Sequence, residues 1–328
     1  MLDLDKTLCL LPYHLCLLKM KDFFKLIRYQ NLLMLALMQL VLRYGFLTWE
    51  NIPLALTDFQ YVLLVISTVL IAAAGYVINN IADQETDGEN KPKNVIVGKS
   101  ISENTAYNIY VGLNITGVAI GFYLSNVIEK PSFAAVFILI AATLYIYATS
   151  LKQMLLVGNI IVALLLAVSV LIVPVFDLYP VTTEENRVSM ATFFSVILDY
   201  AVFAFILNLI REMVKDLEDI NGDYNQGMNT LPIALGRART SKVVFGLSLI
   251  PIILILYYTN KYFATNNLWI ATAYMLFLVA GPLIYFAIKM WSAKTTKHYS
   301  HLSIILKGVI LFGILSIAII TYNIHQHA

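Results

Sequence analysis

The sequence predicts an all-α, polytopic membrane protein with nine transmembrane helices, and three observations lead to that prediction. Of 328 residues, 59% are apolar and only 13% are charged, whereas a soluble domain is about half apolar and about one quarter charged. The mean hydropathy is +0.77. Apolar runs of about 20 residues, the length that a helix needs to cross a bilayer, recur along the chain. A soluble globular enzyme and a disordered chain are therefore excluded.

The nine predicted spans follow one another in chain order, separated by linkers of two kinds. The spans are 31–47, 59–81, 104–127, 132–149, 154–176, 188–211, 241–258, 267–289 and 302–324. The linkers poor in Lys and Arg are 48–58, 128–131, 177–187 and 259–266. The linkers that hold more of the basic residues are 82–103, 150–153, 212–240 and 290–301. The two kinds alternate, as expected when successive linkers lie on opposite sides of a membrane.

The distribution of Lys and Arg orients the chain. With the amino terminus in the cytoplasm, all but four of the 22 basic residues lie on the cytoplasmic side. The four exceptions are Arg43, Lys130, Arg187 and Lys261. This bias predicts a cytoplasmic amino terminus, and nine spans then place the carboxyl terminus outside.

Charge and cysteine content exclude further classes of protein. The formal net charge is only +2, so the chain offers no polycationic surface for a nucleic acid. Cys9 and Cys16 are the two cysteines, and both lie near the amino terminus. They allow no disulfide framework and no cysteine metal site. We expect no nucleic-acid partner, and the sequence indicates no obligate protein partner.

Residues 1–19 form an extension ahead of a second methionine, Met20. The extension lacks a basic segment and an A-x-A cleavage site, so it does not resemble a signal peptide. It is either the product of an upstream start codon or a short interfacial helix. We therefore divide the chain into this extension and one transmembrane domain, residues 20–328.

The acidic residues are unevenly distributed, with nine of the 20 in two stretches after the second and the sixth spans. They are Asp83, Glu85, Asp87 and Glu89, then Glu212, Asp216, Glu218, Asp219 and Asp223. Asn79, Asp83 and Asp87 follow an i, i+4, i+8 spacing, which places them on one helix face. Because carboxylates four residues apart repel each other, the spacing indicates a bound cation. Mg²⁺ is commonly held by one or two carboxylates plus substrate phosphates.

The second stretch repeats this arrangement and both stretches have basic neighbours. Asp219 and Asp223 are again four residues apart, and Asp216 lies one turn earlier. Lys91, Lys93 and Lys99 follow the first stretch, while Arg211 and Lys215 precede Asp219. Carboxylates for a metal with cations beside them suit a diphosphate, because the metal bridges its oxygens and the cations balance the remaining charge.

These motifs resemble those of the UbiA superfamily of intramembrane prenyltransferases. N-N-I-A-D-Q-E-T-D, residues 79–87, matches the family's N-x-x-x-D-x-x-x-D, and D-I-N-G-D, residues 219–223, matches its D-x-x-x-D. The stretch R-E-M-V-K-D-L-E-D-I-N-G-D-Y-N-Q-G-M-N-T-L-P, residues 211–232, is most similar to the digeranylgeranylglyceryl phosphate synthase branch. K-L-I-R-Y-Q-N-L-L-M, residues 25–34, resembles the same branch, with Tyr29 in place of proline.

The resemblance implies a UbiA-like bundle of nine helices with a central cavity that opens near the cytoplasmic side, in a bacterial or archaeal cell membrane. It implies Mg²⁺-dependent transfer of a prenyl group from a prenyl diphosphate, geranylgeranyl diphosphate in this branch, to a lipid-like acceptor, geranylgeranylglyceryl phosphate. The implied catalytic residues are Asn79, Asp83, Asp87, Asp219 and Asp223, of which the four aspartates hold the metal. The implied substrate-binding residues are Arg28, Asn31, Tyr76, Lys91, Tyr147, Lys152, Arg211, Lys215 and Asp216.

Two alternatives remain open. Within the enzyme class, the acceptor could be an aromatic quinone precursor or a chlorin. In another class, an ion-coupled transporter could use the acids, although its acids would be expected near the bilayer midplane. Asp199 lies within the sixth span and is a functional candidate by default. It is about 25 Å of helix from Asp216, too far for the same metal.

Overall fold

The computed structural model describes residues 20–90 and 95–327, and within these ranges the chain forms helices and connecting segments without a β-strand. The extension 1–19 and Lys91 lie outside the described residues. Nine helical segments of the described part are long and apolar enough to cross a membrane, which confirms the predicted number. The protein is an integral, multi-pass membrane protein.

The spanning segments are formed by α2 (Tyr29–Tyr44), α3 (Asp58–Ala82), α5 (Glu103–Val127), α6 (Ala134–Thr149), α7 (Val157–Asp177), α8 (Arg187–Asn225), α10 (Arg237–Tyr258) with η5 (Thr259–Ala264), α11 (Trp269–Tyr274) with η6 (Met275–Ala280) and α12 (Gly281–Ser292), and α13 (Thr296–His327). Short helical turns connect them: η1 (Leu47–Glu50), α4 (Gln84–Asn90), η2 (Pro131–Phe133), η3 (Leu151–Gln153), η4 (Tyr179–Val181) and α9 (Leu231–Leu235).

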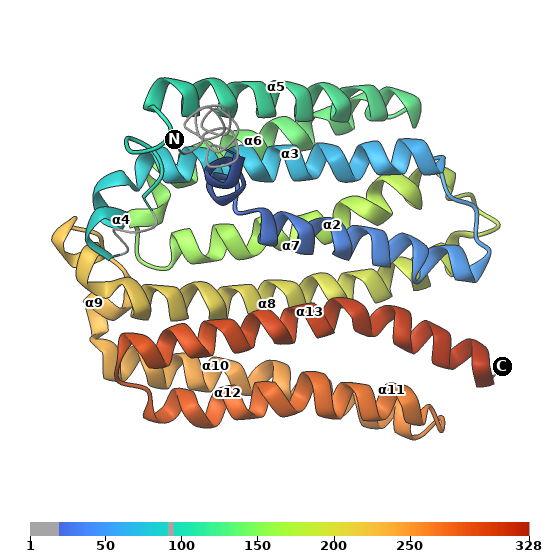
Figure 1. Cartoon of the computed structure of the whole chain (residues 1–328). Coiled ribbons are helices and arrows are strands. Elements are labelled where there is room, and N and C mark those ends of the chain that lie inside the picture. The colour runs from blue at the N-terminus through green and yellow to red at the C-terminus, as the bar shows by residue number, and fades with distance from the viewer. Residues whose placement is uncertain (1–19, 91–94, 328) are drawn as a thin grey trace, which may run out of the picture.

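The spanning helices lie in one bundle, with α5 at one edge and α10, α11 and α12 at the other (Figure 1). Helix α8 lies between the two groups, where it packs against α7 on one side and against α13 and α10 on the other. One buried apolar cluster joins α2, α3 and α7, and another joins α8, α10, α12 and α13. The core is therefore divided between two sub-bundles that meet along α8.

Helix α8 is much longer than its predicted span. It continues from the apolar residues into the polar stretch and ends at Asn225, whereas hydropathy alone ended the span at residue 211. Its 39 residues correspond to about 58 Å at 1.5 Å per residue, against about 30 Å for the hydrocarbon core of a bilayer. The second acidic stretch is thus held on a continuous helix, which also packs against α4.

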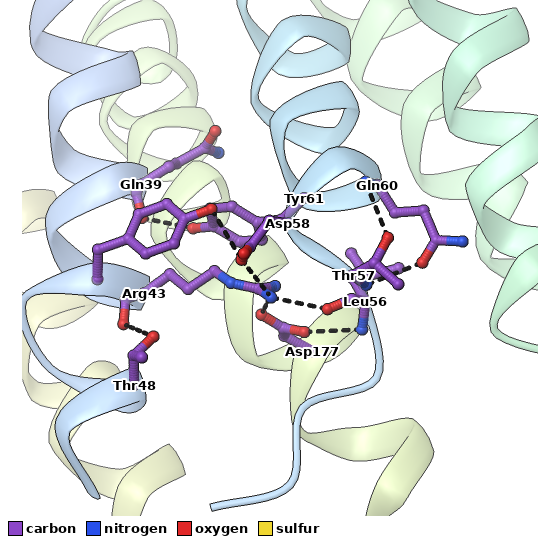
Figure 2. Close-up of polar contacts among 10 residues, drawn as sticks. Gln39, Arg43, Thr48, Leu56, Thr57, Asp58, Gln60, Tyr61 and Asp177 are labelled. Carbon is purple, nitrogen blue, oxygen red and sulfur yellow. Dashed lines mark hydrogen bonds and ion pairs between the residues drawn. The ribbon is translucent and has the colours of Figure 1, made fainter. Parts of the chain in front are cut away.

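A buried polar network joins α2, α3 and α7 (Figure 2). It lies near Asp58, at the opposite end of α3 from Asp83. Arg43 Nη1 donates to Asp177 Oδ2 at 2.6 Å, and its Nη2 donates to the carbonyl of Leu56 at 2.7 Å. The other carboxylate oxygen of Asp177 accepts from Leu56 N at 3.0 Å. The Arg43 side chain is 5% exposed and that of Asp177 is fully buried. This ion pair ties the first, second and fifth spans together.

The network continues from Arg43 toward the middle of the bundle through Gln39. The Tyr61 hydroxyl donates to the carbonyl of Gln39. The Gln39 side chain donates to the carbonyl of Ser169 at 3.0 Å and accepts from the Thr68 hydroxyl at 2.8 Å. Every one of these contacts links two different spans, so the register of α2 against α3 and α7 is fixed by hydrogen bonds as well as by packing.

Candidate active site

The first acidic motif lies where α3 ends. Asp83 is the residue at which the helix terminates, and its backbone NH still donates to the carbonyl of Asn79 at 2.9 Å. Asn79 Nδ2 donates to Asp83 Oδ2 at 2.5 Å, and Lys152 from η3 forms an ion pair with Asp83 Oδ1. Asp87 follows on α4, so the predicted common face belongs to two consecutive helices rather than to one. The break at Asp83 turns the motif toward α8.

The second motif lies on α8, and the packing of α4 against α8 places the segments of the two motifs next to each other. Asp216 Oδ2 accepts from Asn159 Nδ2 of α7 at 2.8 Å. Asp219 follows one turn later, and Asp223, which is 7% exposed, another turn later. We name this end of the bundle, which holds both motifs, the motif end.

The residues of the motif end fit a Mg²⁺ ion that arrives with its substrate. Within residues 20–90 and 95–327, no group of three or more His, Cys, Asp or Glu side chains is arranged to hold a metal ion by itself. Mg²⁺ needs no such cage, because it keeps several waters and takes one or two carboxylates plus substrate phosphates. Asn79 Oδ1 is buried without a hydrogen-bond partner beside the Asp83 carboxylate. That oxygen is of the type that Mg²⁺ prefers.

A cavity of about 250 Å³ lies next to the first motif, between α2, α3, α6, α7, α8 and α13. We call it the front cavity. Seven of the predicted site residues line it: Arg28, Asn31, Tyr76, Asn79, Tyr147, Arg211 and Lys215. Its remaining wall is largely apolar, with Ile71, Phe137, Leu144 and Leu166 among the lining side chains. The sequence therefore identified most of the polar wall of this cavity.

Two predicted substrate-binding residues lie outside this wall. Lys152 forms its ion pair with Asp83 and does not line the cavity, because η3 holds it at the end of α3. Asp216 bonds Asn159 and likewise does not line it. Both residues belong instead to the surroundings of the two acidic motifs. Lys91 lies outside the described residues.

The front cavity is electropositive at its polar end. Four basic side chains line it, Arg28, Arg211, Lys215 and Lys307, against one carboxylate, Glu212. Lys215 Nζ lies 2.5 Å and Arg211 Nη1 lies 3.5 Å from Glu212 Oε1. Arg211 Nε is buried without a partner. Because one carboxylate cannot neutralise four cations, the wall favours an anionic ligand such as a phosphate or diphosphate.

Tyr76 contacts Arg28 and Asn31, and the sequence predicted neither contact. The guanidinium carbon of Arg28 lies 5.3 Å from the centroid of the Tyr76 ring, and Asn31 Nδ2 donates to the Tyr76 hydroxyl at 3.2 Å. Arg28 adopts a left-handed conformation, with φ of 51°, immediately before α2. The Tyr76 ring thus contacts the Arg28 guanidinium in a cation–π arrangement at the cavity wall.

Sequence reasoning missed Lys307, Glu212 and Asn159 as site residues. Lys307 lies inside the ninth predicted span, where an ionisable residue is a functional candidate. It was counted only among the basic residues of the cytoplasmic side. Glu212 was recognised as part of the acidic stretch, but its pairing with Arg211 and Lys215 on the same helix was not predicted. Asn159 lies on α7 and bonds Asp216 across 57 residues.

The sequence is similar to that of a known family of membrane enzymes. Residues 32–323 match the UbiA prenyltransferase family. The chain is also 33% identical over 233 residues to the digeranylgeranylglyceryl phosphate synthase of Sulfolobus acidocaldarius, which covers 70% of this chain and 76% of that protein. The chain belongs to the UbiA prenyltransferase family. The family match spans all nine transmembrane segments and both acidic motifs.

Solved structures of the UbiA family share the fold. A structure described as digeranylgeranylglyceryl phosphate synthase superposes with a TM-score of 0.57 at 24% identity, over 92% of this chain and 99% of that one. A UbiA homologue from Archaeoglobus fulgidus bound to GPP and Mg²⁺ gives 0.53 at 15% identity, over 90% and 99%. At these identities the likeness establishes the nine-helix architecture.

Proposed function

We propose that this member of the UbiA prenyltransferase family transfers the geranylgeranyl group of geranylgeranyl diphosphate, with Mg²⁺, to the free hydroxyl of geranylgeranylglyceryl phosphate. One observation supports this most directly. The front cavity combines four basic side chains, Asn79 and an apolar wall in a single space, and Asn79 is hydrogen-bonded to Asp83. Such a space accommodates two anionic headgroups at one end and hydrocarbon at the other.

The proposed mechanism assigns each group a task. Asp83, Asp87, Asp219 and Asp223 would hold Mg²⁺, which supplies charge stabilisation for the diphosphate as it leaves. Arg28 and Lys215 bind diphosphate oxygens, and their charge is most valuable when negative charge develops on the leaving oxygen. Arg211 binds the phosphate of the acceptor. The apolar wall excludes water, which would otherwise capture the allylic carbon. The glycerol hydroxyl oxygen bonds to C1 of the prenyl group, the C1–O bond to diphosphate breaks, and the hydroxyl proton leaves with the diphosphate.

The acceptor assignment is supported by the relative from Sulfolobus acidocaldarius, whose name specifies digeranylgeranylglyceryl phosphate. It is also supported by the cation count, since a second phosphate needs basic partners beyond those of the diphosphate. The homologue bound to GPP and Mg²⁺ supports the donor class and the metal. We do not retain the transporter alternative, because the motif aspartates lie at helix ends and not at mid-span.

The sidedness belongs to the same proposal. The motif end faces the cytoplasm, with the amino terminus inside and the carboxyl terminus outside, as the Lys and Arg distribution predicts. Reporters fused after Ser100 or Asn225 should report a cytoplasmic position, and one at Thr183 an external position. An external result at Asn225 would contradict the proposed orientation.

An assay of purified protein with geranylgeranyl diphosphate and a panel of acceptors, analysed by mass spectrometry, tests the activity. We expect product with geranylgeranylglyceryl phosphate, no product in EDTA, and recovery on addition of Mg²⁺. Asp83→Asn and Asp219→Asn should lower kcat/KM by about 10²–10³-fold or more. Glu85 is an exposed acid between the motif positions, and Glu85→Gln should leave kcat/KM unchanged. Product only with a hydroxybenzoate, a naphthoate or a chlorin would overturn the acceptor, and activity in EDTA would overturn the metal.

A further inference from the structure

A second cavity of about 460 Å³ lies beyond the front cavity, toward the end of the bundle opposite the motifs. We call it the rear cavity. It is enclosed by α2, α8, α10, η5, η6 and α13. The two cavities share five wall residues, Met38, Val170, Ala204, Ile310 and Ile314. These five residues lie on the boundary between the two cavities, and we call them the neck.

Two helices line the whole path from the charged end to the rear cavity. On α13, Lys307 lines the front cavity, Ile310 and Ile314 line the neck, and Ile317, Thr321 and Ile324 line the rear. On α8, Arg211 and Asn208 are followed in the same direction by Ala204, Tyr200 and Val196. Steps of three and four residues keep each series on one face of its helix.

Most polar side chains of the rear cavity are hydrogen-bonded to protein groups, and the rest of its wall is largely apolar. Tyr258 donates to Asp199 Oδ2 at 3.3 Å, and the hydroxyls of Tyr200 and Ser316 are 2.8 Å apart. The Thr321 hydroxyl donates to the carbonyl of its own helix at 2.8 Å. Because these groups are already paired, they offer little to a polar ligand, and the site suits a flexible apolar chain.

The dimensions fit a long isoprenoid. Lys307 and Ile324 are 17 residues apart on α13, or about 25 Å along the helix. A C20 isoprenoid has a main chain of 16 carbons, and at about 1.2 Å per bond its extended length is roughly 18 Å. A phosphate at Lys307 followed by a glycerol unit and a C20 tail therefore reaches through the neck and into the rear cavity.

The position of the acidic motifs decides which substrate supplies that tail. The Asn79–Asp83 pair stands at the end of α3, and the wall directly below it is formed by Ile71 on α3 with Phe137 and Leu144 on α6. That wall suits the chain of the donor whose diphosphate binds at the motifs. Lys307 and Arg211 instead stand on the two helices that lead to the rear cavity.

We propose that the rear cavity is the binding site for the prenyl tail of the acceptor, whose phosphate lies between Lys307 and Arg211. The proposal rests on the proposed function. It makes tail length a specificity determinant, because only a tail that passes the neck gains contacts with the rear wall. The neck residues and the rear wall then select the acceptor, while the wall below the first motif selects the donor.

Gly313 offers a direct test, because it lines the rear cavity and a Cβ added there meets no heavy atom within 4 Å. Gly313→Leu places a side chain in the rear cavity. Gly308→Leu is the matched control, since Gly308 lies on the same helix, is equally open and lines neither cavity. Ala204→Phe, which narrows the neck, is the second variant. KM is measured for glyceryl phosphates with C5, C10 and C20 tails and for geranylgeranyl diphosphate.

We expect Gly313→Leu to raise KM for the C20-tailed acceptor at least tenfold while KM for the C5-tailed acceptor and for the donor stays within twofold. Gly308→Leu should leave all three unchanged. A rise in the donor KM instead, or no change in any of them, would overturn the proposal. The wild-type protein supplies a test that needs no variant, because its KM should fall from the C5-tailed to the C20-tailed acceptor. The same KM for all three acceptors would also overturn the proposal. If the wild type accepts no glyceryl phosphate at all, the proposed function has failed, which is a different result.

Discussion

The Asp177→Asn substitution should lower the free energy of unfolding more than a substitution of any nearby surface residue. We expect this although Asp177 is remote from the acidic motifs. The substitution preserves the shape of the side chain and removes its charge. Arg43 then keeps the carbonyl of Leu56 at 2.7 Å, Asp58 at 3.3 Å and the Tyr61 ring, whose centroid lies 4.5 Å from the guanidinium carbon. Because the Asp58 side chain is 80% exposed, it is a weak substitute for a buried carboxylate.

The expected magnitude follows from this burial. Removing one partner of a buried ion pair costs about 3–5 kcal/mol, because the remaining charge is left uncompensated. Asp58→Asn, the matched control, removes an exposed partner of the same guanidinium and should cost about 1 kcal/mol or less. The double variant Arg43→Met with Asp177→Leu should recover much of the loss, since it buries no charge.

Equilibrium unfolding of the purified protein in mixed micelles, followed by circular dichroism, measures these differences. Prenyl transfer assayed well below the unfolding transition should remain near the wild-type rate in all variants, because the network lies at the end opposite the motifs. If Asp177→Asn is no more destabilising than Asp58→Asn, or if the double variant is less stable than Asp177→Asn alone, the reasoning is refuted.

Three further predictions concern the site and the packing around it. Lys307→Met should raise KM for the phosphate-bearing acceptor roughly tenfold or more, as expected for a lost charge-assisted hydrogen bond, whereas the same change at the exposed Lys297 should leave it unaltered. Tyr76→Phe should lower the free energy of unfolding by about 1 kcal/mol through one lost hydrogen bond, and Tyr76→Leu by more, because the ring under the guanidinium is lost as well. Gly121→Ala should cost about 1–3 kcal/mol, since the new methyl would lie 2.4 Å from a phenyl ring, while Gly112→Ala enters open space and should be neutral or stabilising in the same unfolding assay.

Hydropathy was sufficient to predict the number of spans, because each must expose apolar side chains to lipid whatever its neighbours are. It could not place the ends of α8 and α13, since both helices continue into polar segments that are held by packing and hydrogen bonds. The acidic motifs were predictable for a different reason. Their spacing lies within one segment, so helix geometry alone relates Asn79 to Asp83.

Most of the features that were not predicted depend on which spans are neighbours. Arg43 was counted only as a cation on the less basic side, because nothing in the sequence pairs it with Asp177, 134 residues later. Lys152 is predicted to bind substrate, but its ion pair with Asp83, 69 residues away, was not predicted. The neck between the two cavities is formed by residues of four helices, and no local pattern could bring Met38, Val170, Ala204 and Ile310 together.

The length of α8 implies that the enzyme draws its ligands from two different phases. Because the helix is roughly twice as long as the hydrocarbon core is thick, its last turns extend into the headgroup region or the water beyond. If the aspartates bind Mg²⁺ as proposed, the ion reaches them from bulk solution, and the bound fraction depends on the Mg²⁺ concentration in the water. A lipid acceptor arrives only within the plane of the bilayer, so the fraction of enzyme with acceptor bound depends on the mole fraction of acceptor among the lipids. Diluting the acceptor with inert lipid at fixed total acceptor should therefore slow the reaction, while the Mg²⁺ concentration for half-maximal activity stays where it was.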